Sequence, residues 1–372
     1  MILKNTDMDT FAKEVYEHKK QVIVFGAGTI LLGWISYVLN QYNITQNIRF
    51  VVDNDSSKWG KEITINGRNL VIAKCDEILD YVTDNMAVLI TSSYFAAIVE
   101  QLDKKEQLTD TECYIAPIMH ITHQKKDESA IVDKSGEMQI PKVIHYCWFG
   151  RGQMPERNRQ CIESWKKYCP DYEIVEWNED NYDVYKNKYM GQAYDVRKYG
   201  YVPDYARIDI LYHHGGIYLD TDVELIKNWD DLLYLKAFTG FEEYPTINFG
   251  GGSGAVKGLP ILKKILDFRE NIAFIQEDGT YNLKTCGYYE TVPLLAEGLA
   301  LDGKRQQIQD LTVFPSETFH PKSSVTGLTE VTDNTYSIHQ FNWSWVGEKQ
   351  LEEKKRTHEE YHGLLRRMQE NG

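Results

Sequence analysis

Two aspartates, Asp220 and Asp222, follow directly after the apolar residues 217–219. On an extended chain, side chains two positions apart point to the same side, so the two carboxylates would lie close together and repel each other. A cation between or beside them would relieve that repulsion. Hard oxygen ligands suit Mg²⁺ or Mn²⁺, which would also bind a substrate diphosphate. The alternative, a solvated turn that carries two acids, stays open at this point.

A predicted helix precedes this pair and carries two further polar side chains. Asp204 and Arg207 are three positions apart, which places them on one helix face. Gly215 and Gly216 would end the helix, and the short apolar strand would start there. We therefore expect the helix and the strand to present these four polar side chains from neighbouring elements.

This segment belongs to the second of two predicted α/β domains. A chain of 372 residues favours two domains. Strand-like and helix-like segments alternate through the first part, which predicts a Rossmann-like parallel sheet with crossover helices. The predicted boundaries are 1–123 for the Rossmann-like domain, 124–139 for a polar linker, 140–347 for the second α/β domain and 348–372 for a charge-rich helical tail.

A glycine turn in the first domain gives an ambiguous signal. Gly26 and Gly28 follow a strand, as in dinucleotide-binding folds, and Asp53 ends the next strand, where an acid would bind a ribose. The third glycine of the fingerprint would be residue 31, which is Leu31, and Gly33 comes two residues late. Two interpretations stay open: the glycines only form the turn, or the turn binds a nucleotide or sugar nucleotide.

Composition excludes several classes of protein. The chain has 41 Lys and Arg against 55 Asp and Glu, a net charge of −14, so nucleic acid is not an expected partner. Its six cysteines form no C-x-x-C pair, which disfavours disulfides and thiolate zinc sites. The uncharged stretch 22–39 is interpreted as strand, glycine turn and helix instead of a membrane span. A cytoplasmic protein is expected, with at most peripheral contact with the inner membrane.

Four segments, in order, resemble a known enzyme family. The residues PDYARIDILYHHGGIYLDTDVE (203–224) resemble the D-x-D region of the glycosyltransferases that include bacterial capsular polysaccharide transferases and yeast Och1-like mannosyltransferases, a family 32-like group. The other similar segments are 140–150, 164–180 and 337–345. The resemblance implies a GT-A type α/β fold for the second domain, with the D-x-D at a metal.

The resemblance also implies roles for the polar side chains. Asp222 would ligate the metal directly, and Asp220 would reach it through water or bind ribose and sugar hydroxyls. His339 would be the third protein ligand. Asp204 and Arg207 would bind the donor sugar, since a carboxylate accepts from hydroxyls and a guanidinium donates to hydroxyl or phosphate oxygens.

Four further residues are expected at the nucleotide. Trp148 would stack on the base, and Tyr218, next to the D-x-D, would contact the nucleotide. Asn342 and Trp345 would close over the diphosphate. In the implied mechanism, the metal and Arg207 offset the charge on the leaving diphosphate, and an acceptor hydroxyl attacks an oxocarbenium-like sugar with retention of configuration.

The sequence thus predicts a metal-dependent retaining glycosyltransferase, a hexosyltransferase of class EC 2.4. The donor would be a nucleotide-diphosphate sugar, with UDP favoured over GDP. The acceptor would be a saccharide, expected to be lipid-linked, in bacterial capsule or surface polysaccharide synthesis. Two alternatives stay open: an oxidoreductase or epimerase that uses the first domain, and a non-catalytic module that binds sugar nucleotides.

Overall fold

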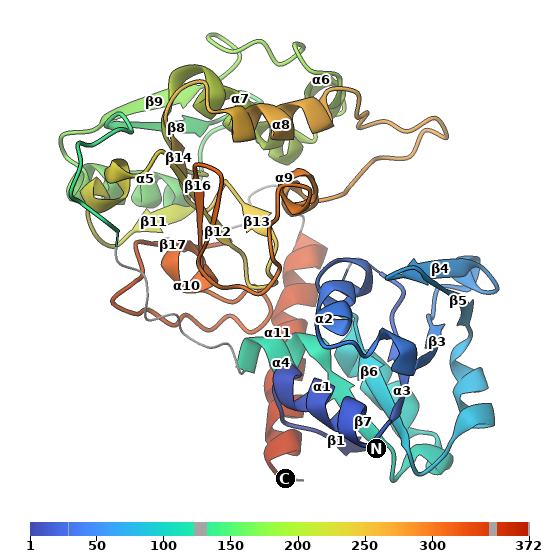
Figure 1. Cartoon of the computed structure of the whole chain (residues 1–372). Coiled ribbons are helices and arrows are strands. Elements are labelled where there is room, and N and C mark those ends of the chain that lie inside the picture. The colour runs from blue at the N-terminus through green and yellow to red at the C-terminus, as the bar shows by residue number, and fades with distance from the viewer. Residues whose placement is uncertain (29, 123–131, 342–347, 371–372) are drawn as a thin grey trace. The chain divides into compact units, whose positions relative to one another are not determined.

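The chain forms two compact units, each with its own sheet (Figure 1). The computed structural model describes residues 1–28, 30–122, 132–341 and 348–370. One unit consists of Met1–Lys125 and Lys349–Gly372, and the other of Lys126–Glu348. The tail expected as a separate element therefore groups with the first unit. Across the described ranges, no helix is both long and apolar enough to cross a bilayer.

The first unit is built on a seven-stranded sheet with the order β1-β7-β6-β2-β3-β5-β4. All neighbouring strands are parallel except β4 and β5, which form an antiparallel pair. Strand β2 has β3 on one side and β6 on the other, so the direction of winding reverses there. The strands are β1 Ile2–Leu3, β2 Gln21–Phe25, β3 Ile48–Val52, β4 Glu62–Ile65, β5 Arg68–Ala73, β6 Met86–Ile90 and β7 Glu112–Ile115.

In this unit α1 lies between β1 and β2, α2 between β2 and β3, and α3 between β6 and β7, and α4 follows β7. Helix α11 is formed by the charge-rich tail, far along the chain from the others. In α11, Tyr361, Leu364 and Met368 are buried, and Arg367 forms an ion pair with Asp103 at the end of α3. The helices are α1 Met8–Glu17, α2 Ser36–Gln41, α3 Phe95–Asp103, α4 Ala116–Thr122 and α11 Glu348–Glu370.

The glycine turn after β2 is held by groups of the protein itself. Gly26 has a φ of +117°, and an added Cβ would lie 3.0 Å from the carbonyl oxygen of Thr91, so glycine is required there. The Oδ2 of Asp53 accepts from the backbone N–H of Ala27 at 2.8 Å and lies 2.9 Å from Nζ of Lys58. These contacts favour the interpretation that the glycines form the turn, since Asp53 takes up a backbone donor that a phosphate would need.

The second unit contains an eight-stranded sheet and a separate two-stranded pair. The order of the large sheet is β15-β16-β12-β14-β10-β8-β9, with β13 paired to β12, and β11 pairs with β17. Strands β8, β9 and β10 are mutually parallel, as are β12 and β16. The predicted α/β class is confirmed. The strands are β8 Val143–Cys147, β9 Glu173–Trp177, β10 Gly216–Tyr218, β11 Val223–Leu225, β12 Ala237–Phe241, β13 Ile247–Asn248, β14 Ser253–Ala255, β15 Gln306–Ile308, β16 Leu311–Phe314 and β17 Ser337–His339.

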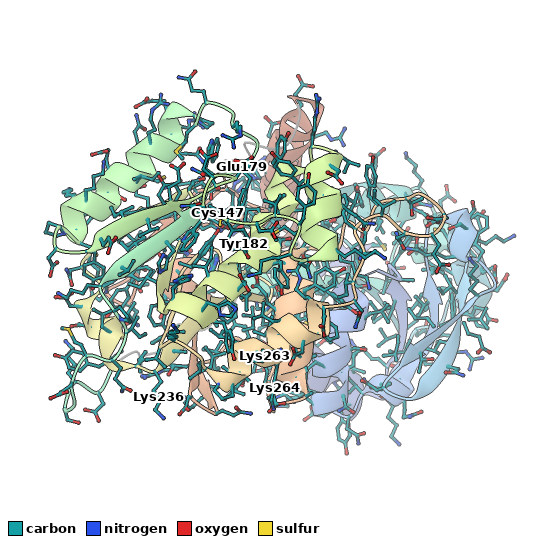
Figure 2. The ribbon with its side chains drawn as sticks, turned by 90° about the horizontal axis from the view of Figure 1, so that it is seen from above. Cys147, Glu179, Tyr182, Lys236, Lys263 and Lys264 are labelled. Carbon is teal, nitrogen blue, oxygen red and sulfur yellow. The ribbon has the colours of Figure 1, made fainter. Side chains whose placement is uncertain are left out.

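Helix α7 is the element that leads into the aspartate pair. It begins with a proline at its first position, where a missing N–H costs nothing, and ends at Gly215 with a φ of +70°. Asp209 on this helix accepts from the hydroxyl of Tyr182 at 2.7 Å, and Figure 2 shows Tyr182 close to Cys147 of β8. The helices of this unit are α5 Glu156–Tyr168, α6 Lys188–Asp195, α7 Pro203–His214, α8 Pro260–Arg269, α9 Cys286–Leu295 and α10 Ser316–Phe319.

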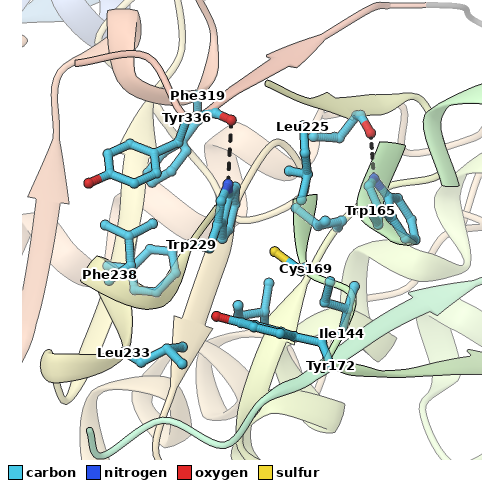
Figure 3. Packing of buried hydrophobic residues seen from close by; sticks show 14 of the residues in the cluster. Ile144, Trp165, Cys169, Tyr172, Leu225, Trp229, Leu233, Phe238, Phe319 and Tyr336 are labelled. Carbon is cyan, nitrogen blue, oxygen red and sulfur yellow. Dashed lines mark hydrogen bonds between the residues drawn. The ribbon is translucent and has the colours of Figure 1, made fainter. Parts of the chain in front are cut away.

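The apolar core of this unit includes residues on both sides of the aspartate pair. Leu219 and Val223 are fully buried in a cluster that also contains Trp165 of α5 and Trp229 (Figure 3). Trp165 donates its indole N–H to the carbonyl of Val223 at 2.7 Å. This bond satisfies both buried polar groups and anchors the backbone directly after Asp222 to the core.

Candidate active site

Asp220 and Asp222 lie in the turn that connects β10 to β11. The backbone N–H of Asp220 donates to the carbonyl of Gly250 at 2.8 Å, and that of Val223 donates to the carbonyl of Asp220 at 3.1 Å. A Cβ at Gly250 would lie only 2.1 Å from Oδ2 of Asp220. A side chain at residue 250 would therefore displace the carboxylate of Asp220 from its present position.

His339 reaches the pair through the pairing of β11 with β17. The register places Val223 opposite His339, and Nε2 of His339 lies 3.1 Å from Oδ1 of Asp222. Burial disfavours a charged imidazole, but the Asp222 carboxylate outweighs this effect and raises the pKa of His339 above its ordinary value. His339 thus contacts Asp222, although the two residues are 117 positions apart in sequence.

Arg207 of α7 lies among three carboxylates. Its Nη2 is 3.2 Å from both carboxylate oxygens of Asp220 and 3.3 Å from Oδ1 of Asp204. Its Nη1 is 3.4 Å from Oε1 of Glu290. Arg207 is only 3% exposed, so these acids, and not water, balance its charge.

Burial raises the pKa values of two acids in this cluster, Asp204 and Glu290. Burial raises the pKa of Asp204, and Arg207 and Arg269 offset this only in part. Burial also raises the pKa of Glu290 to about 7, although Arg207 favours its charged form. For Arg207, burial alone would lower the pKa, but Asp220 and the other acids raise it well above the ordinary value. The excess of acids over cations in a buried place favours the uptake of a cation.

Two polar residues at the site, Glu290 and Asn248, were not expected from the sequence. Oε2 of Glu290 accepts from the backbone N–H of Phe249 at 2.8 Å. Oδ1 of Asn248 accepts from the N–H groups of Gly250 at 2.6 Å and Gly251 at 3.2 Å. The signal that could have located this loop is its run of glycines at 250–252, which is typical of close backbone approach.

The predicted nucleotide-binding residues differ in accessibility. Trp148, directly after β8, is half-buried, and its indole N–H donates to the carbonyl of Gly152 at 2.7 Å. Tyr218 is fully buried, and its ring centroid lies 5.7 Å from the guanidinium carbon of Arg207. In this arrangement the side chain of Tyr218 is not accessible to a nucleotide. The other two candidates, Asn342 and Trp345, lie outside the described residues.

The predicted metal ligands are partly brought together. Asp222 and His339 contact each other, whereas the carboxylate of Asp220 faces Arg207. Within the described part of the chain, no group of three His, Cys, Asp or Glu side chains is arranged to hold a metal. The donor types still fit a divalent cation, because a carboxylate meets an imidazole whose other nitrogen, Nδ1, is buried without a hydrogen-bond partner among the described residues.

Comparison with known proteins supports the class of enzyme that this site suggests. Residues 155–239 match the family described as a glycosyltransferase sugar-binding region containing a DXD motif. This range includes α5, α7 and the aspartate pair. The predicted resemblance to D-x-D glycosyltransferases is thereby supported, and the finer expectation of a bacterial capsule enzyme is not confirmed.

Individual relatives agree with this class. Inositol phosphoceramide mannosyltransferase 1 of Schizosaccharomyces pombe is 32% identical over 124 residues, which cover 30% of this chain and 37% of that protein. The uncharacterized glycosyltransferase L373 of Acanthamoeba polyphaga mimivirus is 28% identical over 193 residues, 49% of this chain and 73% of that protein. The chain spans less than half the length of the mannosyltransferases it matches. A solved structure named PaToxG Glycosyltransferase has a TM-score of 0.34 at 23% identity, covering 43% of this chain and 69% of that chain, a likeness too low to carry weight.

Proposed function

We propose that the second unit is a metal-dependent glycosyltransferase that moves a sugar from a nucleotide-diphosphate donor to an acceptor hydroxyl. The observation that carries this proposal is the buried cluster of Arg207 with Asp204, Asp220 and Glu290, beside Asp222. A polar network that is fixed before the substrate binds needs little reorganisation when charge develops during the reaction. The family match over residues 155–239 supports the same reaction class.

The proposed metal site consists of Asp222 and His339. A bound Mg²⁺ or Mn²⁺ would act as a Lewis acid on the leaving diphosphate. The side chains of Asp222 and His339 are 14% and 10% exposed, so they are accessible to a small ion at the edge of the core. With two protein ligands, the remaining coordination positions would be left to substrate oxygens and water.

The proposed sugar-binding side chains are Asp220 and Asp204, and Arg207 holds them. The side chain of Asp220 is 23% exposed, whereas that of Arg207 is 4% exposed and engaged by acids. This geometry favours a different role for Arg207 from the one the sequence suggested. It would orient the carboxylates that accept from sugar hydroxyls, instead of contacting the leaving diphosphate itself.

The proposed stereochemical outcome is retention, as the resemblance implies. The bond from the sugar to the diphosphate breaks, and an acceptor hydroxyl attacks the oxocarbenium-like sugar on the same face while its proton passes to the leaving diphosphate. NMR of the product anomer in an early time course is expected to show the donor's configuration. Trapping a sugar covalently bound to a carboxylate would contradict the same-face displacement.

The names of the relatives narrow the choice of donor and acceptor. Their names specify mannosyl transfer to inositol phosphoceramide, which favours GDP-mannose as the donor, whereas the sequence alone favoured UDP. A lipid-linked acceptor agrees with both lines of argument. A role in surface polysaccharide synthesis, with the protein in the cytoplasm and in peripheral contact with the inner membrane, is part of the same proposal.

The experiment that tests the proposal is donor hydrolysis with UDP-glucose, UDP-galactose and GDP-mannose, with Mn²⁺ and then with a chelator. We expect one donor to be hydrolysed in a metal-dependent way and Asp222→Asn to lose at least about 100-fold in rate. Hydrolysis that persists with the chelator would contradict the metal site. Nucleotide binding without turnover of any donor, with and without added saccharide, would indicate a binding module, and nicotinamide reduction would indicate the oxidoreductase.

A further inference from the structure

A short loop with three consecutive glycines connects the two halves of the candidate site. We call residues 249–252 the glycine loop; it lies between β13 and β14. The carbonyl of Gly250 accepts from the backbone N–H of Asp220 at 2.8 Å. The carbonyl of Gly251 accepts from the hydroxyl of Ser337 in β17 at 3.4 Å. The glycine loop therefore touches both the aspartate turn and the strand that carries His339.

Glu290 of α9 holds this loop from the other side. Its Oε2 accepts from the N–H of Phe249 at 2.8 Å, and its Oε1 lies 3.4 Å from Nη1 of Arg207. The side chain is fully buried. The next residue, Thr291, accepts from the N–H of Ile247 at 2.8 Å, which fixes α9 to β13. The carboxylate of Glu290 thus bridges the backbone of the glycine loop and the guanidinium of Arg207.

We propose that Glu290 is a positioning residue of the sugar-transfer reaction, which fixes Arg207, and through it Asp220, against the glycine loop. This inference rests on the proposed function. Asp220 bonds to the loop through its backbone and to Arg207 through its side chain. Glu290 bonds to the same two partners, so the four groups form a closed ring of contacts. A closed ring restricts the carboxylate of Asp220 more than either contact does alone.

Such a residue affects the reaction more than the fold. A displacement of about 1 Å at a reacting group can cost about 100-fold in rate. Glu290→Gln keeps the shape and an amide oxygen for the N–H of Phe249, but it removes the charge that pairs with Arg207. We therefore expect kcat for donor hydrolysis to fall about 10- to 100-fold, with KM changed by less than about threefold.

The chain offers a matched control in Glu243. This glutamate is also buried, at 7% exposure, and its carboxylate accepts from Ser323 and Ser324. Like Glu290, it has a pKa raised by burial to about 7. Glu243→Gln should change kcat by less than about twofold. Equal losses in the two variants would overturn the proposal, because they would show a general effect of a lost buried carboxylate.

A double-mutant cycle tests the route through Arg207. In the background of Arg207→Lys, Glu290→Gln should have little further effect on kcat, since the residue through which it acts is already changed. Full additivity of the two substitutions would overturn the proposal.

Crystal structures of the variants test the positioning role of Glu290 independently of the proposed activity. In Glu290→Gln we expect the guanidinium of Arg207 and the carboxylate of Asp220 to move by about 0.5–1 Å, a shift large enough to affect chemistry, and to stay in place in Glu243→Gln. If the wild type hydrolyses no donor, the proposed function fails, and this displacement still decides whether Glu290 positions Arg207. If the wild type is active and neither kcat nor these positions change, the positioning role alone is overturned.

Discussion

Asp53 in the first unit and Asp220 in the second each follow a strand that has a parallel neighbour and rest against a glycine-containing backbone, yet their surroundings differ. Asp53 accepts from the N–H groups of Ala27 and Asp55 and pairs with Lys58. Burial alone would raise the pKa of Asp53, but these donors outweigh it and lower the pKa. The carboxylate of Asp220 bonds instead to a guanidinium that it shares with two other acids.

The difference separates a carboxylate that shapes a turn from one that we propose as part of a site. The partners of Asp53 supply enough positive charge and N–H donors to satisfy it. The three acids Asp204, Asp220 and Glu290 outnumber the two nearby arginines, Arg207 and Arg269, and burial raises the pKa values of Asp204 and Glu290. A bound cation or ligand would stabilise a folded chain with such an imbalance of charge. Side chains with shifted pKa values accordingly cluster at functional sites.

The largest expected effect is on catalysis, from Asp220→Asn. The amide cannot pair with Arg207 as a carboxylate does, so we expect donor hydrolysis to fall roughly 100-fold or more. Steady-state kinetics of the purified variant, with its circular dichroism spectrum compared with the wild type, measures this. A variant that keeps more than half of the activity would remove the distinction between the two aspartates.

Gly250→Ala should have a smaller effect than Asp220→Asn. Its Cβ would lie 2.1 Å from Oδ2 of Asp220, so the aspartate or the glycine loop must move. We expect about a tenfold loss of donor hydrolysis and a loss of about 1–3 kcal/mol of stability from overpacking. Gly28→Ala is the control in the other region, because an added Cβ there meets nothing within 4 Å. Equal results for the two variants would contradict the close approach at Gly250.

The pH dependence of stability should change in Glu243→Gln. Burial raises the pKa of Glu243 to about 7 from an ordinary value of 4.5. Between these values the folded protein keeps a proton that the unfolded chain has lost, so this group's contribution to stability falls as the pH rises. The slope is up to about 1.4 kcal/mol per pH unit. Urea unfolding at pH 5, 6 and 7 should show a smaller decline for the variant than for the wild type; parallel declines would contradict the raised pKa.

The smallest expected effect is that of Asp53→Asn. The substitution weakens the pairing with Lys58 and leaves one N–H without an acceptor, so we expect a loss of about 1 kcal/mol in stability. Thermal unfolding followed by circular dichroism detects it. Donor hydrolysis should stay unchanged, and a large loss of activity would show that the glycine turn of the first unit takes part in the reaction.

The sequence was sufficient to predict the elements around the aspartate pair. Helix α7, its glycine end and the short strand β10 lie where hydrophobic pattern and turn residues predict them. The spacing of Asp204 and Arg207 placed both on one helix face, and both contact the same cluster. These features are local, because helix spacing and strand alternation fix them over a few residues.

The remaining parts of the site depend on contacts that no local pattern encodes. Glu290 meets Arg207 across 83 residues, and a glutamate within a helix gives no sign that it will be buried. Even Tyr218, adjacent to the D-x-D, is fully buried. The sequence could not predict this, because the alternation of the strand does not say which face the core covers. The metal ligation, the donor base and the predicted domain boundaries stay predictions.

The connectivity of the first unit has a consequence for biosynthesis. Its last helix, α11, is encoded after the entire second unit, and Arg367 of that helix pairs with Asp103. During translation the second unit can therefore emerge and fold while the first unit still lacks a helix. Purified chains truncated after residue 348 should therefore contain a protease-resistant second unit and a protease-sensitive first one. The proposed site in the second unit is thus expected to form before the first unit has gained its last helix.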